Sequence, residues 1–294
     1  MDFFLQLMLT GLMVGAIYSL VAVGFVLIYK ASGIFNLAQG ELLMIAAYMC
    51  WAFLVQAHLP LWLGLLLTLG AAALLGLVIE RLALRPMIGQ PLFAIVMITI
   101  ALSIILKGIV TGIWRGSQYY FPEFLPAAPM HLGGVILSQQ HLYCFVAAIL
   151  AVVALTFYFN RTKSGLAMRA VAEDHQVAQS TGVSVKMVFA MTWAIAAIVS
   201  AIGGILLGSI NGVNFNLSVL GLKALPVVLL GGLDSILGAI IAGLGVGVLE
   251  NVAAGYLDPL VGGGLQDVFP FIILLVVLLV KPYGLLGLRK IERV

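Results

Sequence analysis

The sequence predicts an all-α, polytopic membrane protein with a single transmembrane domain over residues 1–294. Its residues are 63% hydrophobic and only 9% charged, whereas soluble domains carry roughly 25% charged residues. Apolar runs of about 20 residues, the length that crosses a hydrocarbon core of roughly 30 Å, recur along the whole sequence. No stretch remains for a soluble domain, and the longest charged passage is a loop at 161–187.

Nine membrane spans are predicted, with eight as the alternative. The run 217–250 is too long for one crossing and is interrupted by Gly-Gly-Leu-Asp-Ser at 231–235, which favours two spans or half-spans that meet at a turn. The N-terminus lacks a basic region and a cleavage site, so we expect it to begin the first span. The predicted spans are 5–29, 37–57, 61–80, 92–113, 141–159, 188–210, the two parts of 217–250, and 268–281.

The basic residues predict an outside N-terminus and a cytoplasmic C-terminus, because Lys and Arg in short loops stay on the cytoplasmic side. The basic residues near the C-terminus fall on the cytoplasmic side only if 217–250 crosses the membrane twice, which favours nine spans. Lys107 and Lys223 fall near outer span ends, where we expect them to snorkel to the headgroups. The predicted cytoplasmic set is Lys30, Arg81, Arg85, Arg161, Lys163, Arg169, Lys186, Lys281, Arg289, Lys290 and Arg293.

The predicted outside loop at 114–140 carries the aromatic tract Tyr119, Tyr120 and Phe121. Aromatic residues of this kind gather at membrane interfaces, which is one interpretation of the tract. The other is a surface that a substrate-delivery protein contacts.

The sequence argues against catalysis. It contains no phosphate-binding Gly-x-x-x-x-Gly-Lys-Ser/Thr loop, no His-Glu-x-x-His motif and no Gly-x-Ser-x-Gly elbow. Its four histidines are not spaced for a metal, and its two cysteines lie in separate apolar runs. We therefore predict no cofactor, no metal site and no ATP hydrolysis on this chain.

Polar residues between the first two spans are candidates for a translocation path. Asn36, Gln39 and Glu41 lie among glycines, and such a segment suits a discontinuous helix whose free N–H groups face a cavity. A short cytoplasmic turn, with Asn36 as N-cap of the second span, explains the same residues. Glu41 matches the positive end of a helix dipole under either interpretation.

Three further residues complete the candidate path. Tyr18 lies within the first span, where its hydroxyl either joins two helices or faces a pore. Asn214 belongs to an asparagine-rich tract that also suits an outside turn. Asp234 lies at the glycine-rich reversal, and capping of the following span is the favoured interpretation of its carboxylate.

The cytoplasmic loop predicts one short helix over 165–179. Its apolar residues recur at helical spacing, while Arg169, Glu173 and Asp174 occupy other faces. Ser164 is the expected N-cap and Gly182 the expected stop. A helix this short needs something to pack against. It either lies on lipid or docks into a groove of a cytoplasmic partner.

Small-residue spacing predicts close helix packing. Gly-x-x-x-Gly pairs occur at 11–15, 204–208 and 243–247, and such pairs let helix backbones approach closely in lipid.

Several segments resemble the LivH-type permeases of branched-chain amino acid ABC importers, in the same order along essentially the whole chain. They are Gly-Leu-Met-Val-Gly-Ala-Ile-Tyr-Ser-Leu-Val-Ala-Val-Gly at 11–24, Ile-Phe-Asn-Leu-Ala-Gln-Gly-Glu at 34–41, Gly-Leu-Ala-Met-Arg-Ala-Val-Ala at 165–172, and Leu-Gly-Gly-Leu-Asp-Ser-Ile-Leu-Gly-Ala at 230–239.

The resemblance implies a permease subunit of the bacterial inner membrane that moves branched-chain amino acids, or a related small amide or amino acid, by alternating access. It implies a second, LivM-like permease, two cytoplasmic ATPase subunits and a periplasmic substrate-binding protein. It also implies that 165–182 is the coupling helix, whose candidate ATPase-contacting residues are Gly165, Arg169, Ala172, Glu173, Asp174 and Gly182.

A competing hypothesis is a channel or ion-coupled secondary transporter that acts without ATPase partners. That class usually requires an ionisable residue at mid-membrane. Glu41 and Glu250 are the acidic residues closest to that condition.

Overall fold

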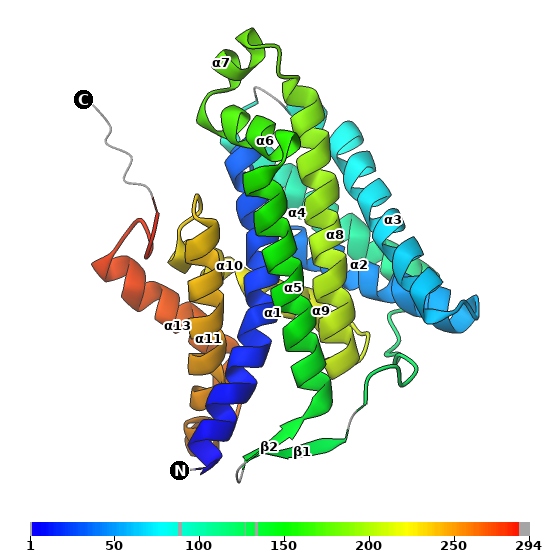
Figure 1. Cartoon of the computed structure of the whole chain (residues 1–294), viewed down its shortest axis with the longest axis vertical. Coiled ribbons are helices and arrows are strands. Elements are labelled where there is room, and N and C mark those ends of the chain that lie inside the picture. The colour runs from blue at the N-terminus through cyan, green and yellow to red at the C-terminus, as the bar shows by residue number, and fades with distance from the viewer. Residues whose placement is uncertain (1, 88–89, 127, 133–134, 288–294) are drawn as a thin grey trace. The chain divides into compact units, whose positions relative to one another are not determined.

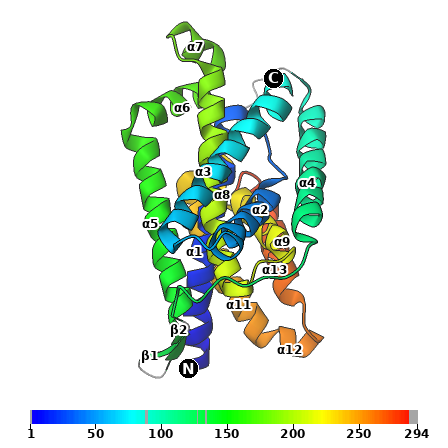
Figure 2. The same cartoon turned by 90° about the vertical axis from the view of Figure 1, so that its right-hand side faces the viewer.

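A computed structural model describes residues 2–87, 90–126, 128–132 and 135–287 (Figures 1 and 2). Arg289, Lys290 and Arg293 of the predicted cytoplasmic set lie outside these residues. The chain divides into two compact units. The first unit comprises Met1–Val26, Leu125–Ile149 and Lys223–Val294, and the second comprises Leu27–Phe124 and Leu150–Leu222.

The second unit is built around helix α2 (Gln39–Trp51). Met49 is the one residue of α2 that is not buried, as expected for a helix that is apolar on every side after its first turn, which carries Gln39 and Glu41. Helices α3 (Leu61–Ile79), α4 (Leu92–Trp114), α8 (Val185–Asn211) and α9 (Asn216–Leu222) pack on it. The unit also holds the end of α1 (Asp2–Ser32), η1 (Ala52–Gln56), η2 (Glu80–Leu84), η3 (Arg85–Met87), the end of α5 (Gln139–Arg161), α6 (Lys163–Glu173) and α7 (His175–Ser180).

The first unit places α11 (Ile236–Tyr256) against α10 (Ala224–Gly231) and α13 (Leu265–Val280). It also holds most of α1, the start of α5 and the short α12 (Asp258–Val261). Strands β1 (Pro129–Leu132) and β2 (Val135–Ser138) form an antiparallel hairpin with Met130 opposite Leu137. This hairpin was not predicted, because strands of four residues within a proline-containing loop give almost no periodic signal.

Helices α1 and α11 approach closely through glycines of the first unit (Figure 1). A Cβ atom at Gly15 would lie 2.6 Å from the carbonyl oxygen of Gly243, and one at Gly11 would lie 2.6 Å from that of Gly247. Two of the predicted Gly-x-x-x-Gly pairs therefore face each other, which is how such pairs bring helix backbones together.

Replacement of Gly15 by Ala is expected to lower the free energy of unfolding by about 1–3 kcal/mol, because the added methyl group meets backbone that cannot move aside without separating the helices. Gly70→Ala in α3 is the matched control, since nothing lies within 4 Å of a Cβ atom there. The midpoint of thermal unfolding in one detergent compares the two variants. Equal midpoints would contradict the close approach.

Helices occur at each predicted span, and the predicted break at 231–235 separates α10 from α11. Within the described residues, six helices are long and apolar enough to cross a membrane, while 216–231 and α13 are shorter apolar helices. In the α2 segment, 13 α-helical residues continue into a π-helical turn, η1. The count of nine spans therefore stays a prediction. A further break at Lys223, between α9 and α10, was not predicted.

Candidate translocation path and coupling segment

A buried polar row joins the start of α2 to α8. The side-chain amide of Asn36 donates to Gln39 Oε1 at 2.9 Å, and that of Gln39 donates to Ser200 Oγ at 2.7 Å. Asn36 Oδ1 accepts the N–H of Ala38, and Ala38 is the N-cap of α2. The interpretation of Asn36 as N-cap is thus wrong by two residues, because its side chain stabilises the turn before the helix.

Glu41 forms an ion pair with Lys107 of α4. Its side chain is 0% exposed, and its Oε1 lies 3.1 Å from Lys107 Nζ. Neither carboxylate oxygen has a hydrogen-bond partner within the described part of the chain. The pair is therefore held by charge attraction, and Lys107, which is 43% exposed, directs its ammonium group to the buried carboxylate.

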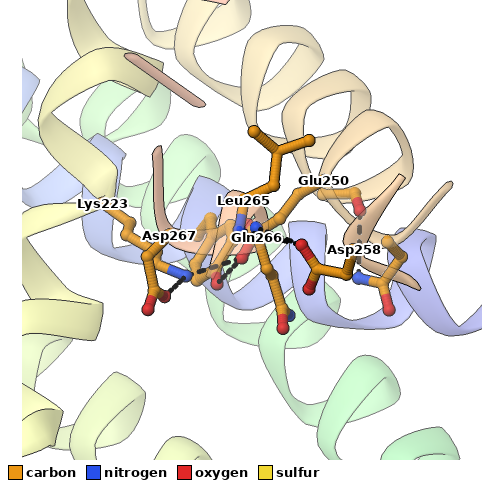
Figure 3. A network of polar contacts seen from close by, with 9 residues as sticks. Lys223, Glu250, Asp258, Leu265, Gln266 and Asp267 are labelled. Atoms are coloured by element: carbon orange, nitrogen blue, oxygen red, sulfur yellow. Dashed lines mark hydrogen bonds and ion pairs between the residues drawn. The ribbon is translucent and has the colours of Figure 1, made fainter. Parts of the chain in front are cut away.

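A second ionic network lies in the first unit, around Lys223 at the start of α10 (Figure 3). Lys223 Nζ lies 2.7 Å from Glu250 Oε1 of α11 and 2.8 Å from Asp267 Oδ1 of α13. Tyr18 of α1 donates its hydroxyl hydrogen to Glu250 Oε1 at 3.4 Å. Four elements thus supply one network.

The expectation that Lys223 snorkels is wrong, because its side chain is only 3% exposed. Two carboxylates neutralise the ammonium group inside the protein, so it need not reach the headgroups. Tyr18 is one of the predicted path residues, whereas Lys223 and Asp267 were not predicted to belong to the path. The available signal was a charged residue inside an apolar run.

The other two path candidates lie in turns. Asn214 Oδ1 accepts the N–H of Asn216 at 2.9 Å, just where α9 begins. Asp234 is half-buried between α10 and α11. The favoured capping role of Asp234 is wrong: Ser235 is the N-cap of α11 and accepts the N–H of Gly238 at 3.0 Å. The serine precedes the first helical residue directly, which is the capping position.

Of the six path candidates, the structure joins Asn36 and Gln39 directly. The second unit also contains Glu41 and Asn214, whereas Tyr18 and Asp234 belong to the first unit.

The segment 165–182, which is predicted to be the coupling helix and is called the coupling segment below, falls in two helices, α6 and α7, where one continuous helix was predicted. Asp174 separates them with an extended backbone, φ −156° and ψ 118°. Its carboxylate accepts the N–H groups of Gln176 at 2.7 Å and Val177 at 3.0 Å, and this capping makes a new helix start favourable there. Thr162, and not the predicted Ser164, caps α6. The predicted stop residue Gly182 follows α7 with φ +86°.

Contacts with the end of α5 fix the position of α6. The guanidinium group of Arg169 donates a hydrogen bond to the carbonyl oxygen of Phe159 and lies 5.6 Å from the centroid of the Phe159 ring. A Cβ atom at Gly165 would lie 2.6 Å from the Tyr158 carbonyl oxygen, so only glycine fits this approach. Ala172 is half-buried. The residues of the segment that face outward include Leu166, Glu173, Asp174, Gln176 and Val177.

The cap at Asp174 predicts a pH dependence. Backbone hydrogen bonds from Val177 and Gln176 hold the pKa of Asp174 below its ordinary value of 3.8. Because the folded-state pKa is lowered, the carboxylate stabilises α7 fully above the unfolded-state pKa, and this stabilisation is lost as the pH falls through the lowered value. We therefore expect exchange of the α7 amide hydrogens, corrected for intrinsic rates, to accelerate at acidic pH.

Asp174→Ser is the control, because a serine cap is retained without a titrating group in this range. Its corrected amide exchange is expected to lack the acidic acceleration. An equal acceleration in both proteins would assign the effect to another group.

A cavity of about 470 Å³ adjoins α7 within the second unit. Ser32 at the end of α1, Ile95 in α4 and Val185 at the start of α8 line it together with His175 and Gln179 of α7. His175 Nε2 lies 3.2 Å from the Ala31 carbonyl oxygen. The coupling segment thus contacts the ends of helices that are apolar over their length.

Long apolar helices, ion pairs enclosed among them and a polar helical segment at helix ends together define a multi-pass membrane protein. The family model described as the permease component of branched-chain amino acid transport systems matches residues 7–278. The chain belongs to this family of transport permeases.

Relatives match over nearly their full length. The high-affinity branched-chain amino acid transport system permease protein BraD of Pseudomonas aeruginosa is 32% identical, with 99% of this chain and 98% of BraD covered. The corresponding LivH proteins of Salmonella typhimurium and Escherichia coli K12 are 33% and 32% identical, with the same shares covered.

A solved structure shares the fold. A chain of PsaBC from Streptococcus pneumoniae, determined in complex with Fab, matches with a TM-score of 0.51 at 14% sequence identity. The match covers 95% of this chain and 92% of the other.

Proposed function

We propose that this chain is a transmembrane subunit of an ABC importer and forms part of the translocation path for branched-chain amino acids. The observation that carries the proposal is the family match over residues 7–278, together with relatives of known substrate class that align over 99% of the chain. The relatives' substrate is transferred to this chain as a hypothesis.

The energy source in this proposal is a pair of cytoplasmic ATPase subunits. The sequence has no phosphate-binding loop of its own. Exposed Glu173 and Val177 give the coupling segment both charge and apolar surface for a partner. The packing of Arg169 on Phe159 would transmit a displacement of α6 to α5. A second permease and a periplasmic substrate-binding protein complete the proposed assembly.

Alternating access would use the polar groups within the helices. Asn36, Gln39 and Glu41 are buried in the second unit, and Tyr18 belongs to the ionic network of the first. Asn214 and Asp234 lie in turns at helix ends. ATP and loaded binding protein would favour different conformations of the assembly, which is what drives a two-state transporter.

The proposed location is the bacterial cytoplasmic membrane, with the N-terminus outside and the C-terminus inside. Support comes from the second unit: Lys30 near the end of α1 and Arg169 of α6 both lie over the ring of Phe159, and Lys186 at the start of α8 lines the cavity beside α7. Positive charge of this kind marks the cytoplasmic side.

Uptake by proteoliposomes tests the proposal. The chain is co-expressed with its partner subunits, purified and reconstituted, and uptake of radiolabelled leucine, isoleucine and valine is measured with and without internal ATP and external binding protein. Uptake that requires both is the expected result. Uptake by the chain alone, driven by an ion gradient, would instead support a secondary transporter.

A further inference from the structure

The ionic network around Lys223 has an unequal distribution of charge and burial. One ammonium group contacts two carboxylates, at 2.7 Å and 2.8 Å. The side chains of Lys223 and Glu250 are 3% and 0% exposed, whereas that of Asp267 is 72% exposed. Figure 3 shows Asp267 on one side of the ammonium group and Glu250 on the other. The network therefore has a buried ion pair and one carboxylate at its surface.

Only the buried pair is needed to neutralise Lys223. Glu250 supplies the counter-charge and is itself held by the Tyr18 hydroxyl group. If Asp267 moves away, its carboxylate regains water, and Lys223 keeps its buried partner. An exchange of Asp267 for another carboxylate would thus leave no buried charge unpaired, which is the condition that usually forbids such a change.

The network also has an unused acceptor. Glu250 Oε2 is buried and has no hydrogen-bond partner among the residues that the structure describes. Buried polar atoms are almost always hydrogen-bonded, so an orphaned oxygen calls for a donor from a water molecule or a ligand. A cationic donor beside this oxygen and Asp267 would be stabilised by both carboxylates.

An α-amino acid carries the complementary charges on neighbouring atoms: a carboxylate for Lys223 and an ammonium group for the carboxylates. We propose that Lys223, Glu250 and Asp267 form the binding subsite for the zwitterionic end of the transported amino acid. Its carboxylate takes the place of Asp267 on Lys223, and its ammonium group binds Asp267 and Glu250 Oε2. This subsite rests on the proposed transport of amino acids and leaves the side-chain specificity to other residues.

Direct binding to the full chain tests the subsite without the selectivity of a binding protein. The chain is placed in lipid nanodiscs, and radiolabelled leucine is displaced by unlabelled leucine, by leucinamide, which lacks the carboxylate, or by isocaproate, which lacks the ammonium group. The wild-type chain is expected to prefer leucine over both analogues by about tenfold or more, since each analogue loses one set of charge-assisted hydrogen bonds.

Asp267→Asn is the informative variant. In this variant the ammonium group of leucine loses the Asp267 carboxylate as a partner. Isocaproate, in contrast, no longer competes with that carboxylate for Lys223. The preference for leucine over isocaproate is expected to fall by about tenfold. Lys223→Met combined with Glu250→Gln, which leaves no unpaired buried charge, is expected to abolish binding of both. The controls are Asp2→Asn and Lys281→Met, which change exposed charges elsewhere in the first unit.

Any of three results would overturn the subsite. The preference for leucine over isocaproate could be unchanged in Asp267→Asn, the double variant could still bind leucine, or the wild-type chain could bind no leucine. Normal uptake by the wild-type importer beside any of these results leaves the proposed function intact. The opposite result is also distinguishable. If leucine binding depends on Asp267 but the full complex takes up no branched-chain amino acid, the proposed function is contradicted and the subsite is retained.

Discussion

Replacement of Lys223 by methionine is expected to lower the free energy of unfolding by about 3–5 kcal/mol, the cost of removing one partner from a buried ion pair. Lys223 is the cation that contacts Glu250 and Asp267, and the Glu250 side chain is 0% exposed. Methionine would fill much of the same volume, so the loss measures charge compensation rather than packing. The midpoint of thermal unfolding in a single detergent reports the change.

The double variant Lys223→Met and Glu250→Gln separates charge from shape. It removes both buried charges together, and replacement of a whole ion pair is often close to neutral. Asp267 is 72% exposed and remains hydrated. We expect the double variant to recover most of the lost stability. A double variant as unstable as the single one would mean that hydrogen bonding or packing around Lys223, and not its charge, stabilises the unit.

Reversal of charge at Glu173 is expected to reduce ATP-driven uptake by about tenfold or more, equivalent to a loss of about 1.4 kcal/mol at the contact with an ATPase subunit. Glu173 is the last residue of α6 and is exposed, so Glu173→Arg alters the surface offered to a partner and leaves the buried face of α6 unchanged. Uptake and co-purification of the ATPase subunits are measured on the same membranes.

Asp2→Arg is the matched control, because Asp2 is also an exposed acidic residue but lies at the start of α1, at the end of the chain that is predicted to be outside. Its uptake is expected to equal that of the wild type. The coupling role would be contradicted if Glu173→Arg transported normally, or if both variants lost uptake to the same extent.

The sequence predicts the helices of this protein well, because the length of an apolar run is a local property that the membrane itself requires. The break at 231–235 was predicted because its two glycines are a local turn signal, although the capping role was assigned to Asp234 and belongs to Ser235. The break at Lys223 was not predicted: Gly221 and Pro226 flank it, but each is a weaker turn signal alone than the Gly-Gly pair at 231–232, and the charged partners Glu250 and Asp267 come from separate helices.

The coupling segment illustrates another limit. Apolar spacing continues through Asp174 and favours one helix over 165–179, yet Asp174 caps a second helix instead. Both arrangements satisfy the same periodicity. The choice depends on the competition between one backbone hydrogen-bond ladder and a side-chain cap, and on how α6 packs against α5 through Gly165 and Arg169.

The enclosure of α2 has a consequence for how the protein is made. This helix carries Gln39 and Glu41 at its start and is covered by α8 and α9, whose residues are synthesised more than a hundred positions later. Glu41 can pair with Lys107 once α4 has been made, but Gln39 lacks its acceptor Ser200 until α8 exists, and lipid is a poor substitute. Helix α2 can therefore reach its final surroundings only late in biogenesis, after α8 and α9 have been inserted beside it.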